Sequence, residues 1–147
     1  MKRVAACAAL AATMTIIVAC GSDEKRLGAD EFIKQANAVC DAGRIAIDAV
    51  AAEMFASGEQ PTAEQLMTFG NETVVPKVQE QIDGIKKLSP PSDLEDDVDQ
   101  MIADAQEALD KIKDDPASAL SGEEDPFADV NAQAAAIGLT ACAGNEG

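Results

Sequence analysis

The sequence predicts an all-α domain arranged as an up-down four-helix bundle. Ala is the commonest residue, at 29 of 147, whereas Trp, Tyr and His are absent and there are only four Phe. Ala favours helices and lets them pack closely, while a β-sandwich relies on β-branched and aromatic residues. Apolar residues also recur at spacings of three and four residues in four separate segments, which is the period of an amphipathic helix.

The first helix is predicted from about Asp30 to Ala56. Asp30 is a good N-cap, and Ser57-Gly58 supplies a residue pair on which helices commonly end. The apolar stripe of this segment consists of Phe32, Ala36, Val39, Gly43, Ile47, Val50 and Met54, with Cys40 beside it.

The second helix is predicted from Thr62 to Leu88, and it opens with Thr62-Ala63-Glu64-Gln65, the pattern of a capping box. Pro76 interrupts it, because proline removes one backbone hydrogen bond and crowds the carbonyl group of Glu72. We therefore expect a kink or break between Gly70 and Pro76. The stripe comprises Leu66, Phe69, Val74, Val78, Ile82, Ile85 and Leu88.

Two further helices complete the predicted bundle. The third follows Pro90-Pro91 with a second capping-box pattern, Ser92 to Glu95, and ends near Asp114. After a loop from Asp115 to Glu124, the fourth begins at Asp125-Pro126, an N-cap followed by proline, and ends at Cys142. Short connections favour antiparallel neighbours, so the first helix should lie beside the fourth.

The N-terminus has the features of an export signal. Met1-Lys2-Arg3 is a short positive head, and the uncharged segment 4–19 would span about 24 Å as a helix, less than the roughly 30 Å hydrocarbon core. The following Ile17-Val18-Ala19-Cys20 resembles the lipobox of bacterial lipoproteins. This resemblance implies cleavage after Ala19, a diacylglycerol on Cys20, and a protein anchored on the extracytoplasmic side of the cell membrane.

The resulting organisation is a signal peptide at 1–19, a lipidated Cys20 with a tether to residue 28, a helical domain at 29–144, and a tail at 145–147. Removal of Cys7 with the signal and lipidation of Cys20 leave Cys40 and Cys142. Two Cys in an exported chain indicate one disulfide, with two free buried thiols as the alternative. A bridge closing a loop of about 100 residues would contribute roughly 4–5 kcal/mol.

Several motifs of the domain occur together in small secreted and lipid-anchored helical proteins of actinobacteria, which this chain resembles. They are a Cys in the first helix, a Leu-x-Pro-Pro turn and a Gly-Leu-x-x-Cys ending. Here these are Cys40, Leu88-Ser89-Pro90-Pro91, and Gly138-Leu139-Thr140-Ala141-Cys142. The resemblance implies no known activity.

The composition argues against an enzyme. Without His there is no His-dependent triad, no His-ligated zinc site and no imidazole base. No cofactor motif is present, and no catalytic or metal site is predicted. The acids in the first turns of the third helix and in the loop at 121–125 are interpreted as a favourable helix-dipole arrangement and a solvated loop. The acids in the helix are Asp93, Glu95, Asp96, Asp97 and Asp99.

Charge restricts the possible partners. The segment 1–19 carries two of the 11 basic residues and none of the 27 acidic ones, so the mature chain has a formal charge of −18. This charge repels nucleic acid and anionic lipid, and it favours a partner with a basic face. Arg44, beside the apolar stripe, is expected to pair with Asp41 or Asp48.

Three functional hypotheses follow, of which the third is buffering of divalent metal ions by the acidic faces of the domain. The first is a non-enzymatic interaction module of the cell envelope, bound to the membrane through its lipid and docking a basic envelope protein. The alternative is a carrier that holds a lipid or another small apolar ligand between its helices. It is motivated by Met54, Met67 and Met101 and by the irregularity expected at Pro76.

Overall fold

The computed structural model describes residues 26–144. The predicted signal peptide, Cys20, residues 20–25 of the tether and the tail at 145–147 lie outside the described residues. The described part is all-helical and contains no strand, which confirms the predicted fold class. None of the helices within it is both long enough and apolar enough to cross a membrane.

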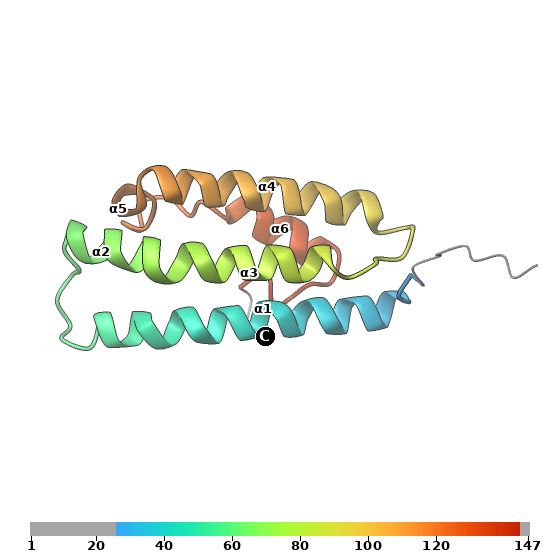
Figure 1. The fold of residues 1–147 in the computed structure, drawn as a ribbon, viewed down its shortest axis with the longest axis horizontal. Coiled ribbons are helices and arrows are strands. Elements are labelled where there is room, and N and C mark those ends of the chain that lie inside the picture. The colour runs from blue at the N-terminus through green and yellow to red at the C-terminus, as the bar shows by residue number, and fades with distance from the viewer. Residues whose placement is uncertain (1–25, 145–147) are drawn as a thin grey trace, which may run out of the picture.

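Three long helical segments lie side by side (Figure 1). Helix α1 (Ala29–Met54) packs against α3 (Val75–Lys86), which packs on its other side against α4 (Glu95–Asp114). The core is formed by apolar residues of all three segments and of the C-terminal region. Its members include Phe32, Ala36, Ile82, Ile85, Val98, Met101, Leu109, Ala134 and Leu139.

The second predicted helix forms without interruption but changes its winding. Helix α2 (Ala63–Phe69) starts at the predicted capping box, in which Thr62 accepts a hydrogen bond from the Gln65 N–H. It continues through a π-helical turn, η1 (Gly70–Val74), into α3. The irregularity expected between Gly70 and Pro76 is therefore a wider turn. A wider turn suits the missing N–H of Pro76 and relieves the crowding by its ring.

The structure differs from the predicted up-down four-helix bundle in the place of the fourth helix. Helix α6 (Ala128–Ala136) packs on α4, and no Cα atom of α6 lies within 8 Å of one in α1. The predicted pairing of the first helix with the fourth is thus wrong. The returning segment after α6, residues 137–144, reaches α1 instead. The physical reason is Gly138, whose φ of 84° ends the helix before Cys142.

Two predicted N-termini are also corrected. Helix α1 begins with Gly28 as N-cap, and Asp30 lies in its first turn. The Ser92 capping box does not form, because α4 begins at Glu95 with Leu94 as its N-cap.

The predicted loop from Asp115 to Glu124 contains a short helix, α5 (Pro116–Ala119), capped by the Asp115 side chain. At Asp125-Pro126 the chain makes only a turn, and α6 starts at Ala128.

The start of the domain is fixed to the turn between α3 and α4. The Leu27 N–H donates to the Ser89 carbonyl oxygen at 2.9 Å, and the Arg26 guanidinium lies 2.8 Å from a Glu95 carboxylate oxygen. Leu27 also packs against the core. The described part of the chain therefore starts beside the Leu-x-Pro-Pro turn, at that end of the long helices.

Candidate functional site

The C-terminal segment lies across α1 and is held there by polar and covalent contacts. After α6, Gly138 adopts a left-handed conformation, and the Leu139 N–H donates to the Ala134 carbonyl oxygen at 2.8 Å. This reversal places the Leu139 side chain, which is fully buried, in the core. Only glycine adopts such a φ without strain, so the Gly-Leu pair redirects the chain toward α1.

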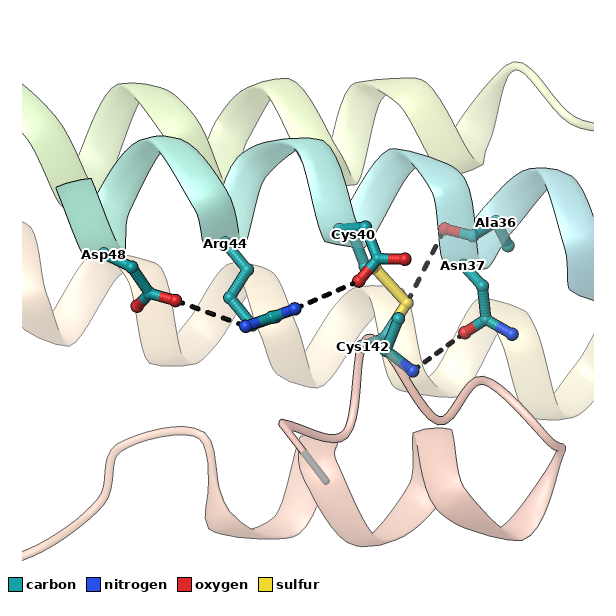
Figure 2. A network of polar contacts seen from close by, with 8 residues as sticks. Ala36, Asn37, Cys40, Arg44, Asp48 and Cys142 are labelled. Atoms are coloured by element: carbon teal, nitrogen blue, oxygen red, sulfur yellow. Dashed lines mark hydrogen bonds and ion pairs between the residues drawn. A yellow bond between two sulfur atoms is a disulfide. The ribbon is translucent and has the colours of Figure 1, made fainter. Parts of the chain in front are cut away.

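The predicted disulfide lies at this crossing (Figure 2). The sulfur atoms of Cys40 and Cys142 are 2.01 Å apart and their Cα atoms are 5.0 Å apart. Asn37, one turn before Cys40, accepts a hydrogen bond from the Ala141 N–H at 3.0 Å and donates to the Gly138 carbonyl oxygen at 3.3 Å. Sequence reasoning missed Asn37. A polar, weakly helix-favouring residue at the spacing of the buried face could have indicated its role.

An apolar pocket opens beside the disulfide, with a volume of about 350 Å³. Its walls come from α1, α3, α4, α6 and the segments that adjoin them. The apolar lining consists of Ile47, Phe69, Val74, Val78, Ile82, Ile85, Met101, Ile102, Ala105, Leu120, Pro126, Phe127, Val130 and Ala141, together with the disulfide itself. Pockets of about 300–1,000 Å³ with mostly apolar walls and few polar groups are typical of small-ligand sites.

The pocket exists because the fourth side of the bundle is short. Helix α1 has 26 residues and α4 has 20, but α6 has only nine. The C-terminal segment contacts α1 around Cys40 and ends its described part at Gly144. Farther along α1, Arg44 and Ile47 continue the face of Cys40 at four and seven residues, and they line the pocket.

Charged groups stand at the edge of the pocket. Arg44 lies 3.3 Å from Asp48 and 3.4 Å from Asp41, which confirms its predicted pairing (Figure 2). From the α6 side, Asp125 lines the pocket, and its carboxylate accepts from the Phe127 N–H at 2.9 Å and from the Asn131 amide at 3.1 Å. Asp125, which the sequence placed in a loop, therefore holds the turn that precedes α6 through these two hydrogen bonds.

The methionines that suggested a ligand pocket are only partly found there. Met101 is buried and lines the pocket, whereas Met54 and Met67 do not. Met67 is instead half-exposed on α2. The pocket is built mainly from branched aliphatic and aromatic side chains, and only one of the three methionines contributes to it.

The acids at the start of α4 do not form a metal centre in the described part of the chain. Between residues 26 and 144 no group of three or more Cys, Asp and Glu side chains is arranged to hold a metal ion. Glu95 binds Arg26, and this hydrogen bond lowers the pKa of the Glu95 carboxyl group. Hydrogen bonds from Gln133 and Gln100 lower the pKa of Asp104 in the same direction.

The lowered pKa values lie away from the pocket. Asp110 is a third such group, through hydrogen bonds from Lys113 and Gln106, and none of Glu95, Asp104 and Asp110 lines the pocket. All three carboxyl groups are stabilised in their charged form by neighbouring donors. The pocket itself can enclose an apolar group, and the charged side chains of Arg44 and Asp125 line it.

Comparisons with protein-family models, with curated proteins and with solved structures found no match.

Proposed function

We propose that this chain is a non-enzymatic binding protein of the bacterial cell envelope, anchored by lipid, whose helical domain carries a small apolar ligand. The observation that carries the proposal is the apolar pocket of about 350 Å³ beside the Cys40–Cys142 bridge. On this view the domain is a variant of the up-down four-helix bundle in which a short fourth helix leaves room for a ligand.

The driving force for binding is removal of apolar surface from water. Transfer of apolar surface from water yields about 25 cal/mol per Å², so the enclosure of even a short alkyl chain is favourable. The lining is already assembled in part, because Ile82, Ile85 and Met101 are buried in the core while Ile47 and Val78, which also line the pocket, are partly buried.

A matched pair of residues on α1 tests the proposal. Ile47 lines the pocket, whereas Ile45, two residues earlier, is 62% exposed and does not line it. We expect the mature chain from residue 21 to bind the neutral apolar fluorophore N-phenyl-1-naphthylamine. Ile47→Asn should weaken binding about fivefold, since half of the burial energy of an Ile side chain is about 1 kcal/mol. Ile45→Asn should leave binding unchanged.

The chain from residue 21 is suitable because the core and the disulfide lie within residues 26–144. Circular dichroism melts of both variants establish that the domain is folded. The proposal is contradicted if the parent chain does not bind the fluorophore. It is also contradicted if Ile47→Asn and Ile45→Asn weaken binding equally.

The lipid anchor is part of the same proposal. The lipobox ending at Cys20 and the uncharged segment before it support cleavage after Ala19 and acylation of Cys20. Residues 21–25 can span at most about 17 Å, and Arg26 is paired with Glu95 at the start of α4. The turn between α3 and α4 would then face the membrane. Intact mass of native material tests this, and an unmodified Cys20 thiol or retained residues 1–19 would contradict it.

A second candidate role is docking of a basic envelope protein, which the mature charge of −18 supports. A partner of this kind would be captured at low salt and released at high salt, because exposed charges are screened. The absence of any salt-sensitive partner would count against this role without affecting the pocket.

A further inference from the structure

We propose, resting on the proposed function, that the pocket prefers an amphiphile with an ammonium head group over one with a carboxylate. Two features of the pocket support this preference, the charge around its opening and the rings in its walls. Both are separate from the apolar volume that supports ligand binding itself.

Acidic groups outnumber basic ones when the charged residues that line the pocket are taken together with those that contact Arg44. Arg44 is the one cationic side chain among the described residues that line the pocket, and no described Lys lines it. Around Arg44 stand Asp41 and Asp48, and Asp125 lies on the α6 side. Two carboxylates thus contact the guanidinium and a third, that of Asp125, lines the pocket, while Glu123 and Glu124 precede Asp125 in an exposed loop.

An anionic head group has little to gain from Arg44. The two aspartates are at positions three and four residues from Arg44 on the same helix, and they contact it at 3.4 and 3.3 Å. A ligand carboxylate would have to displace groups that are already held beside the guanidinium. It would also approach Asp125 and the strongly negative surface of the domain, which repels it within a Debye length of about 8 Å.

A cationic head group meets the opposite situation. It is attracted by the same carboxylates without displacing Arg44. Two of the four Phe of the chain, Phe69 and Phe127, also line the pocket. Aromatic rings attract alkylated ammonium groups through their quadrupole while accepting the methyl groups as apolar surface. A slender alkyl chain with an ammonium head therefore matches both the walls and the edge.

The test uses three ligands with the same ten-carbon chain: decyltrimethylammonium, 1-decanol and decanoate. Each displaces N-phenyl-1-naphthylamine from the mature chain at pH 7, below the concentration at which micelles form. We expect decyltrimethylammonium to displace the fluorophore at about tenfold lower concentration than decanoate, with decanol between them. The reason is that several exposed charge pairs between the head group and the domain, of a few tenths to 1 kcal/mol each, change sign between the two charged ligands. The difference should shrink in 0.5 M NaCl.

Asp125→Asn should reduce the difference between the cationic and anionic ligands, since it removes one carboxylate that lines the pocket while keeping an oxygen acceptor for the Phe127 N–H. Asp97→Asn is the matched control, because it changes the net charge equally from an exposed position in the first turn of α4 that does not line the pocket. It should leave the difference unchanged.

Equal or stronger binding of decanoate overturns the inference and leaves the carrier function intact. A preference that Asp97→Asn reduces as much as Asp125→Asn also overturns it, because the preference would then arise from net charge alone. If the fluorophore does not bind the parent chain, the proposed function fails and the inference fails with it.

Discussion

Removal of the Cys40–Cys142 bridge should destabilise the domain more than any other single change at the site. The bridge joins α1 to the segment after α6 with a sequence separation of 102 residues. We consider the double substitution Cys40→Ala/Cys142→Ala, which avoids leaving a buried thiol or a hydroxyl group at Cys40, a position only 3% exposed.

The magnitude follows from the length of the loop that the bridge closes. Without it, the unfolded chain regains the entropy of an open segment of about 100 residues, which corresponds to about 4.7 kcal/mol at 25 °C. For a domain of this size the same loss lowers the melting temperature by about 15–20 °C. Leu139 and the Asn37 hydrogen bonds still hold the C-terminal segment in the folded state, so the helices should remain at low temperature.

Urea unfolding of the parent chain, the double alanine variant and the parent chain in reductant measures this loss. The variant and the reduced parent should coincide, both several kcal/mol less stable than the oxidised parent. A difference below about 1 kcal/mol would show that the bridge does not stabilise the domain as expected, and two thiols that react with a thiol reagent once the oxidised protein is unfolded would show that the bridge is absent. The second result would support the alternative of free thiols.

Two further predictions concern packing and pH. A Cβ on Gly84 would lie 2.8 Å from the Val39 Cγ1 atom, so Gly84→Ala should cost about 1–2 kcal/mol in urea unfolding despite the better helix propensity of Ala. Val39→Ala should cancel most of the added cost in a double-mutant cycle, and additive losses would contradict the contact. The pKa of Asp104 lies below its ordinary value of 3.8, because Gln133 and then Gln100 donate hydrogen bonds to the carboxylate. The resulting stability is complete above the ordinary pKa and is lost as the pH falls through the lowered value. Gln133→Ala should return the pKa toward 3.8 in an NMR titration, and an unchanged pKa would exclude this cause.

Local signals in the sequence were sufficient for the long helices and for the disulfide. The Thr62 capping box, the stripes of α1, α3 and α4 and the irregularity before Pro76 all depend on residues within a few positions of one another. Val50 is an exception, because the predicted α1 stripe includes it and the structure leaves it 40% exposed. The partner of Cys40 followed from counting the cysteines that remain under the prediction that Cys7 is cleaved off and Cys20 is lipidated.

Signals that depend on distant contacts were misjudged. The Asp-Pro pattern at Asp115-Pro116 starts a helix, and its buried Pro116 packs so closely on Gly70 that a Cβ on that glycine would lie 2.6 Å from the Pro116 Cβ atom. The same pattern at Asp125-Pro126 makes a turn. Glu95, predicted to act in a capping box, binds Arg26, which is 69 residues away in the sequence.

The pocket could not be predicted because its presence depends on where α6 ends and on which helix it contacts. The apolar period through Ile137 and Ala141 continues that of α6, so sequence reasoning extended the helix to Cys142. Gly138 instead turns the chain toward Asn37. A full-length fourth helix beside α1 would have covered Ile47 and Val78, which line the opening in the structure.

The most direct test of ligand binding between the helices is a methyl NMR titration of the chain from residue 21 with N-phenyl-1-naphthylamine. We expect the largest shift changes at the methyl groups of Ile47, Val74 and Val78, which line the pocket, while those of Ile45 and Val50 stay unchanged. Changes centred on Ile45 and Val50, or no saturable change at the pocket methyl groups, would contradict this expectation.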